Sequence, residues 1–244
     1  TRYIGDWSSD VCSSDLRNFD FSFFSFLDFC IAYGEVREWY FCNAFVWIAG
    51  IVNGINWLDG MDGLAAGISF LISIGMAIIG ISINNNLAII FASSIAGASS
   101  GFLFYNLPPA RIIMGDAGSN LLGFNLAITS LVLLLDDESI GILPFSFIIF
   151  FVPIFDMLKV IFLRLRQGYS PFRPDRNHLH FQLLRNKLSE KKVLLLIYLL
   201  TLLCISISLY KFNLIFAVPL LFISFVGIVV IVSNKFLKKI FNLK

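Results

Sequence analysis

The sequence predicts an all-α, polytopic membrane protein, and two observations carry this prediction. Of its 244 residues, 58% are hydrophobic and only 14% are charged, whereas soluble domains average about 45–50% apolar and about 25% charged residues. From about residue 42 onward, apolar runs long enough to cross a bilayer alternate with short polar breaks. A soluble globule, a disordered chain and a collagen-like repeat are therefore excluded.

The apolar runs predict about seven membrane-spanning helices, because about 20 residues are needed to cross a hydrocarbon core of about 30 Å. Residues 19–33 are the candidate remnant of one more span. The polar breaks contain the expected turn-forming and charged residues, such as Pro108-Pro109. The expected spans are 42–57, 64–83, 87–105, 119–135, 142–163, 193–210 and 214–232.

The N-terminal segment is expected to differ from the rest. The chain begins at Thr1, and residues 8–16 contain a short near-duplicate with neither the basic start nor the apolar run of a signal peptide. We expect residues 1–18 to be non-native or disordered. Residues 19–244 are expected to form one transmembrane domain that is incomplete at its N-terminus.

The placement of Lys and Arg predicts the orientation in the membrane. Once the helices are made to alternate, one set of loops and the C-terminal tail carry almost all the basic residues, and the opposite set carries Arg37 and Lys211. The positive-inside rule places the basic set in the cytoplasm. Three polar clusters, Asn53–Gly63, Asn106–Asn120 and Arg164–Lys192, are then expected to face the cytoplasm together.

The first cluster places four polar residues at intervals of three, namely Asn53, Asn56, Asp59 and Asp62. This spacing puts them along one side of a helix end, where several oxygen atoms can face one ligand. Carboxylates near hydrocarbon cost about 2.5–3.5 kcal/mol each on insertion scales, so they indicate a functional site. The alternative is a solvated turn in which Asn and Asp act as caps.

The second cluster centres on Asp116, which lies between Gly115 and Gly118 and just before a predicted helix. Glycine allows a sharp turn and a close approach to a ligand, and helix N-termini favour anions. The alternative is an N-cap made by Asp116 or Ser119.

The third cluster holds both histidines of the protein, His178 and His180, beside Arg173 and Arg176. No third His or nearby Cys completes a tetrahedral zinc site. Forked Arg donors and imidazole fit phosphate recognition better. The basic residues alone could serve as a positive-inside anchor, but this role needs no histidine.

These motifs resemble one family. The string from Asn53 to Leu64, the Gly115-Asp116-Ala-Gly-Ser string and the string from Pro174 to His180 occur in this order between apolar helices. Together they are similar to the polyprenyl-phosphate N-acetylhexosamine-1-phosphate transferases, over about residues 42–232. The Pro-Asp-Arg-x-His-x-His form resembles the undecaprenyl-phosphate GlcNAc-1-phosphate branch more than the phospho-MurNAc-pentapeptide translocase branch.

The resemblance implies an enzyme that transfers a sugar-1-phosphate, expected to be GlcNAc-1-phosphate, from a UDP-sugar to a polyprenyl phosphate and releases UMP. It implies Mg²⁺ as cofactor, with Mn²⁺ as the alternative ion. Its implied partners are the UDP-sugar, the lipid phosphate and the membrane, without nucleic acid, and a homodimer is left open. The implied location is a bacterial inner membrane, with the active site on the cytoplasmic face and a product that initiates a cell-envelope glycan.

The resemblance also implies roles for individual residues. Asn56 and Asp116 match the magnesium ligands, and Asp59 and Asp62 match the acidic pair of the catalytic site. His178 and His180 match the catalytic loop that stabilises charge and positions the phosphates. The implied substrate-binding residues are Asn53, Arg173 and Arg176. Direct attack by the lipid phosphate and a covalent carboxylate intermediate both stay open.

The sequence departs from the family pattern at two points. The family carries an upstream Asp-Asp pair on a cytoplasmic loop without a counterpart here, so we expect the fragment alone to be weak or inactive. Phe181 stands where many relatives have a further His.

Two rival functions stay open. One is a transporter or channel for an anionic solute, which would place charges in the middle of broken helices. The other is an intramembrane aspartyl protease, which would not explain the histidines.

Overall fold

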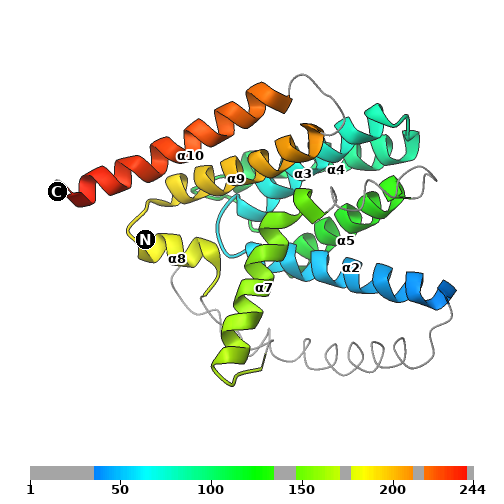
Figure 1. The fold of residues 1–244 in the computed structure, drawn as a ribbon, viewed down its shortest axis with the longest axis horizontal. Coiled ribbons are helices and arrows are strands. Elements are labelled where there is room, and N and C mark those ends of the chain that lie inside the picture. The colour runs from blue at the N-terminus through cyan, green and yellow to red at the C-terminus, as the bar shows by residue number, and fades with distance from the viewer. Residues whose placement is uncertain (1–35, 135–146, 171–176, 211–216, 241–244) are drawn as a thin grey trace.

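The computed structural model describes residues 36–134, 147–170, 177–210 and 217–240, and its regular elements in these segments are helices. Figure 1 shows them as a bundle of long helices with one short helix, α8, at one end. The helices are α2 (Val36–Leu58), α3 (Leu64–Ser82), α4 (Asn86–Asn106), α5 (Gly115–Leu134), α7 (Phe151–Arg166), α8 (Leu179–Arg185), α9 (Glu190–Tyr210) and α10 (Ala217–Ile240).

The helices follow the predicted spans, with differences at several helix ends and one unpredicted helix. Helix α5 begins at Gly115 instead of residue 119, and α10 continues to Ile240, past its predicted end at residue 232. Helix α2 already begins at Val36, and α7 continues to Arg166, so Arg164 and Arg166 lie in its last turn, where cations complement the helix dipole. Helix α8 was not predicted, because seven residues are too few to give an apolar period. Residues 1–35 and 142–146, which include the predicted remnant span, lie outside the described residues.

Three helices of the described part, α3, α4 and α9, are long and apolar enough to cross a membrane. Two shorter apolar stretches, Cys42–Leu58 and Ala217–Val229, lie in α2 and α10. Large apolar side chains also cover the outside of the bundle, including Phe104 (75% exposed) and Phe222 (68% exposed). So much exposed apolar surface is typical of helices in contact with lipid.

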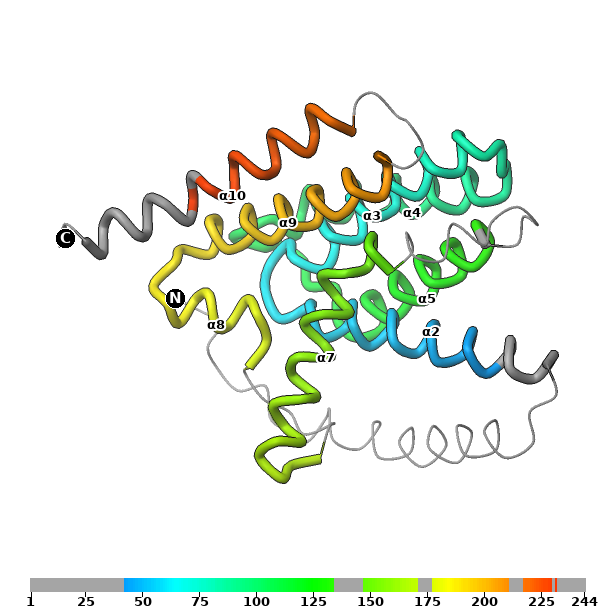
Figure 2. The backbone as a smooth tube through the Cα atoms, in the orientation of Figure 1, coloured from blue at the N-terminus to red at the C-terminus, as the bar shows by residue number. Residues whose placement is uncertain are grey.

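Helix α3 lies at the centre of the bundle, in contact with α2, α4, α5 and α9 (Figure 2). Its fully buried side chains include Ile68, Ile72 and Met76. These side chains belong to a core cluster to which α2, α4, α5 and α9 also contribute. The polar ends of these helices are thereby fixed relative to one another.

Glycines mark the closest helix crossings. A Cβ at Gly123 in α5 would lie 2.7 Å from the Cα of Val52 in α2, so these two backbones touch. In α3, Gly67 lies directly under the ring of Tyr198 from α9. Small residues let membrane helices approach closely enough for dispersion forces to hold them. The α2–α5 and α3–α9 contacts set the positions of the polar residues described next.

Candidate active site

Polar residues from all three predicted clusters meet at one end of the bundle. Asn56 at the end of α2 contacts Asp116 at the start of α5, although 60 residues separate them. Gly60, in the turn between α2 and α3, lies against His180 of α8. The helix ends therefore bring together segments that are distant in the sequence.

The centre of this site is the pair Asn56 and Asp116. The Asn56 Nδ2 donates to Ser119 Oγ at 2.9 Å and lies 3.4 Å from Asp116 Oδ1. Asp116 is exposed and belongs to the first turn of α5 instead of preceding the helix, as we had expected. Gly115 begins α5 with φ +67°, a left-handed conformation that glycine adopts at little cost.

Three carboxylates share this region. Burial, together with the neighbouring charges of Asp116 and Asp62, raises the pKa of Asp59 to about 7. Asp62 Oδ2 accepts a hydrogen bond from Ala110 N at 3.0 Å, which ties the turn after α2 to the segment before α5. The site therefore concentrates negative charge, with Asp59 near half-protonation at neutral pH.

The donor set fits Mg²⁺ as an ion shared with a substrate. Within the described residues, no three His, Cys, Asp or Glu side chains form a candidate metal cluster. Mg²⁺ does not need such a cage, because it commonly binds one or two carboxylates together with waters and substrate phosphates. Asp116 and the amide oxygen of Asn56 are hard donors of this kind. Burial is the main cause of the raised Asp59 pKa, and repulsion from Asp116 and Asp62 adds to it; a bound cation would relieve that repulsion.

His178 is held by α7. Its Nδ1 lies 2.9 Å from Asp156 Oδ2, and the Leu179 N–H donates to Asp156 Oδ1 at 2.6 Å. His178 is 6% exposed and Asp156 1% exposed. One carboxylate thus fixes both the imidazole and the first residue of α8.

His180 occupies a different environment. It is fully buried, and neither ring nitrogen has a hydrogen-bond partner. A Cβ at Gly60 would lie only 2.6 Å from its Nε2, so the ring fits because position 60 is glycine. Burial, reinforced by the nearby His178, lowers the pKa of His180 to about 4. At neutral pH the His180 ring is therefore uncharged.

Trp57 connects the histidines to α7. Its ring meets the His178 ring edge-on at 5.6 Å, and the Arg164 guanidinium lies 4.9 Å from the centroid of the same indole. Arg164 is 4% exposed. A desolvated cation–π contact of this kind contributes about 2 kcal/mol. Trp57, which follows Asn56 in the sequence, thereby links the C-terminal end of α2 to the histidine segment.

The turn between α2 and α3 is braced at Gly63, which has φ +76°. Its N–H donates to Asn106 Oδ1 at 2.9 Å, and its carbonyl accepts from the Tyr198 hydroxyl at 2.5 Å. Helices α4 and α9 therefore both hold this turn. Asp59 and Asp62 lie within it.

Some predicted site residues are not joined to this site. The Asn53 side chain donates to Ala49 O within α2 at 2.8 Å, and no hydrogen bond links it to Asp116 or the histidines in the described residues. Arg173 and Arg176 lie outside the described residues. The predicted set that the structure brings together consists of Asn56, Asp59, Asp62, Asp116, His178 and His180.

The sequence interpretation missed Asp156, Trp57 and Tyr198. Asp156 and Lys159 stand three residues apart in α7, and an ion pair joins them at 3.8 Å. The shorter contacts of Asp156 are nevertheless to His178 and Leu179. The sequence feature that could have identified Asp156 is an acidic residue in an otherwise apolar predicted span.

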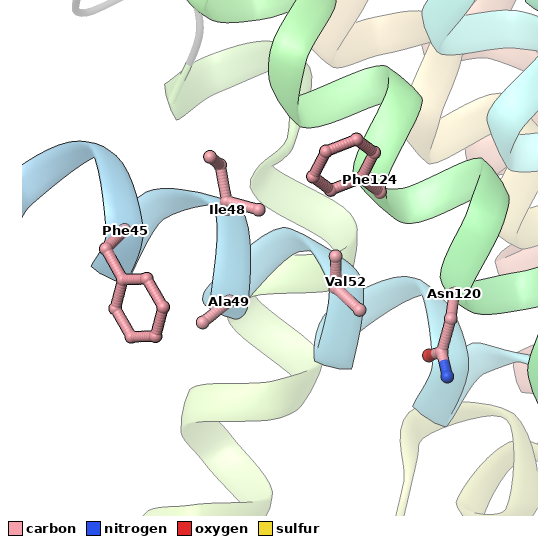
Figure 3. Close-up of a pocket in the computed structure, with 6 residues that line it drawn as sticks. All are labelled: Phe45, Ile48, Ala49, Val52, Asn120 and Phe124. Carbon is pink, nitrogen blue, oxygen red and sulfur yellow. The ribbon is translucent and has the colours of Figure 1, made fainter. Parts of the chain in front are cut away.

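A shallow apolar pocket of about 310 Å³ lies beside the polar site, between α2 and α5 (Figure 3). Val52 and Asn120 line it, one helical turn from Asn56 and Asp116 respectively. Its remaining lining residues are Phe45, Ile48, Ala49 and Phe124. Apolar surface therefore adjoins the site on the α2–α5 side.

The fold and the site define a helical membrane protein with acidic, amide and imidazole groups gathered at one end of the bundle. Residues 12–134 match the model of the family described as "Glycosyl transferase family 4". The chain belongs to this family.

Three relatives illustrate the likeness. The chain is 38% identical, over 64% of its length and 43% of the relative, to a Bacillus subtilis (strain 168) protein named "Probable undecaprenyl-phosphate N-acetylglucosaminyl 1-phosphate transferase". It is 37% identical, over 61% of its length and 42% of the relative, to a decaprenyl-phosphate N-acetylglucosaminephosphotransferase of Mycobacterium leprae. A phospho-N-acetylmuramoyl-pentapeptide-transferase of Caldanaerobacter subterraneus is 33% identical over 73% of the chain and 55% of the relative. The matches thus span about half the length of these relatives.

Proposed function

We propose that this chain is part of an enzyme that transfers a sugar-1-phosphate from a UDP-sugar to a polyprenyl phosphate and releases UMP. The enzyme would be a multi-pass protein of a bacterial inner membrane, with about seven helices from this chain and the site on the cytoplasmic face. Its product would initiate a cell-envelope glycan. The observation that carries the proposal is the meeting of Asn56 and Asp116 with the turn of Asp59 and Asp62 and with the histidine segment.

The reaction joins two anionic phosphates, so the site must hold negative groups close together. A bound Mg²⁺ would neutralise phosphate charge, and Asp116 and Asn56 are the residues that would hold it. Asp59 and Asp62 would add negative charge to the same site. His178 and neutral His180 would contribute hydrogen bonds that position phosphate oxygens, with Arg173 and Arg176 as cationic partners and Asn53 as a further substrate contact.

The apolar surroundings suit a lipid acceptor. A polyprenyl phosphate combines a long apolar chain with an anionic head group. The pocket of Figure 3 supplies apolar surface one turn from the Asn56–Asp116 pair. Family membership favours this transferase over a transporter of an anionic solute or an aspartyl protease.

We propose GlcNAc-1-phosphate as the transferred group. The support is the Pro-Asp-Arg-x-His-x-His sequence at residues 174–180, together with the names of the two relatives at 38% and 37% identity. N-acetylmuramoyl-pentapeptide phosphate is the second candidate, because relatives named for that activity also match.

The test uses purified protein that carries this chain with its native upstream sequence, and the chain alone in parallel. Each is mixed with polyprenyl phosphate and either UDP-GlcNAc or UDP-MurNAc-pentapeptide, with and without Mg²⁺. We expect UMP and lipid-linked GlcNAc from UDP-GlcNAc, only with the metal, and little from the chain alone. Release of UDP, or turnover without metal, would assign another reaction class. Turnover of only the muramoyl donor would reassign the sugar.

A further inference from the structure

Asp156 and His178 are arranged so that the carboxylate determines which nitrogen of the ring carries a proton. Asp156 Oδ2 lies 2.9 Å from His178 Nδ1, and the pair is buried. An ionised carboxylate only accepts hydrogen bonds, so Nδ1 must be the donor. His178 Nε2 makes no hydrogen bond within the described residues.

The surroundings of Asp156 favour its ionised form. Its Oδ1 accepts from the Leu179 N–H at 2.6 Å, and the Lys159 ammonium lies 3.8 Å from the same oxygen. Lys159 also donates to Gln182 Oε1 at 3.2 Å, which keeps it beside α8. A backbone donor and a cation on Oδ1 leave Oδ2 as a full acceptor for the ring.

We propose that Asp156 is a positioning residue that holds His178 with its proton on Nδ1, so that Nε2 is the ring atom reserved for the substrate. This inference rests on the proposed function for the identity of that substrate, a phosphate-bearing UDP-sugar or lipid. With Nδ1 always protonated, Nε2 accepts a proton when the ring is neutral and donates one when the ring is charged. The phosphate group of the substrate then faces a single ring nitrogen, His178 Nε2.

The ring is also fixed in orientation. Trp57 contacts it edge-on at 5.6 Å, and the His180 ring stacks on it with centroids 5.8 Å apart and an interplanar angle of 14°. Asp156 thus selects the nitrogen, while Trp57 and His180 restrict rotation of the ring. A carboxylate in this position commonly fixes both the tautomer and the orientation of a functional histidine.

The substitution Asp156→Asn separates this role from a purely structural one. The Asn Oδ1 can keep the hydrogen bond from Leu179 N–H, which then turns the NH₂ group towards His178 Nδ1. Because an amide NH₂ only donates, the ring must offer a lone pair at Nδ1 and carry its proton on Nε2. The shape of the contact survives, but the tautomer is inverted.

The experiment measures the tautomer directly by ¹⁵N NMR of the histidine-labelled protein in detergent or lipid. The protein has two histidines, so a His180→Ala sample assigns the signals of His178. We expect Nδ1–H in the unmodified protein, Nε2–H in Asp156→Asn, and Nδ1–H again in Asp156→Glu. Lys159→Met is the matched control, since it removes the 3.8 Å ion pair without touching the ring, and it should leave the tautomer unchanged.

Turnover supplies the second readout. In the complete protein, Asp156→Asn should lower kcat for UMP release by at least ~10²-fold, the scale of losing one positioned acid–base group, with a smaller change in KM. Asp156→Glu should recover part of the loss. Nε2–H in the unmodified protein, or an inverted tautomer at unchanged kcat, would overturn the inference. Absence of UMP release from the unmodified protein would instead refute the proposed function, because the NMR result does not depend on turnover.

Discussion

Gly60 and His180 touch so closely that a Cβ at position 60 would lie 2.6 Å from the imidazole Nε2. The contact joins the turn after α2 to the short helix α8, whose residues are about 120 positions apart in the chain. Because His180 is fully buried, its ring cannot move into solvent to relieve the overlap. Glycine at position 60 is thus a geometric requirement of the site.

Gly60→Ala should displace the His180 ring and lower transfer activity by about 10²-fold, the loss expected from a misplacement of about 1 Å. The check is UMP release together with thermal unfolding in detergent. Gly97→Ala is the matched control, because nothing lies within 4 Å of a Cβ there. Full activity of Gly60→Ala would show that His180 does not act at this site.

Asp116→Asn and His178→Ala should separate metal binding from phosphate positioning in the complete protein. The first removes a charged oxygen at nearly constant volume, so activity should fall by at least ~10²-fold and excess Mg²⁺ should restore only part of it. The second removes a phosphate contact, so turnover should drop comparably with unchanged metal dependence. Activity titrated against Mg²⁺ distinguishes them. The opposite pattern would reverse the two roles.

Metal affinity should increase with pH around neutrality because of Asp59. Its pKa is raised to about 7 by burial and by Asp116 and Asp62, so it is protonated below that pH and ionised above it. An ionised Asp59 adds negative charge near the ion, and Mg²⁺ therefore competes with the proton. Calorimetric titration from pH 6 to 8 measures the slope. Asp59→Asn cannot titrate, so its slope should be flatter; an unchanged slope would exclude Asp59 as the source.

Gly123→Ala should weaken the α2–α5 contact that aligns Asn56 with Asp116. The added Cβ would lie 2.7 Å from the Val52 Cα, and backbone cannot yield as a side chain can. Overpacking of this kind costs about 1–3 kcal/mol. A lower unfolding temperature and lower activity are expected together. Gly101→Ala, where the space is open, should preserve both.

The charge asymmetry predicts which side of the membrane holds the site. In a background without reactive native cysteines, Ser170→Cys should react with an impermeant maleimide only after cells are permeabilised. Asp137→Cys should react in intact cells. Labelling of position 170 from outside would contradict the cytoplasmic placement.

The sequence by itself determined the helices and most of the candidate site. Spans could be predicted because the bilayer imposes a minimum length of apolar residues, and this constraint acts locally. The motifs around Asn56, Asp116 and His178 are also local, and their residue types together with the family resemblance predict phosphate and metal chemistry. Helix α8 escaped prediction because seven residues are too few to give an apolar period, and the helix is held by contacts with α7 and α9.

Only the tertiary structure decided how these groups are arranged and what surrounds them. Asp156 forms an ion pair with Lys159, three residues away, and the fold also places its carboxylate on His178, 22 residues away. Likewise, His180 is neutral because the turn at Gly60 covers it, and Tyr198 reaches Gly63 across 135 residues. Burial, tautomer and pKa depend on which helices pack together, and that packing is set by long-range contacts such as Gly123 against Val52.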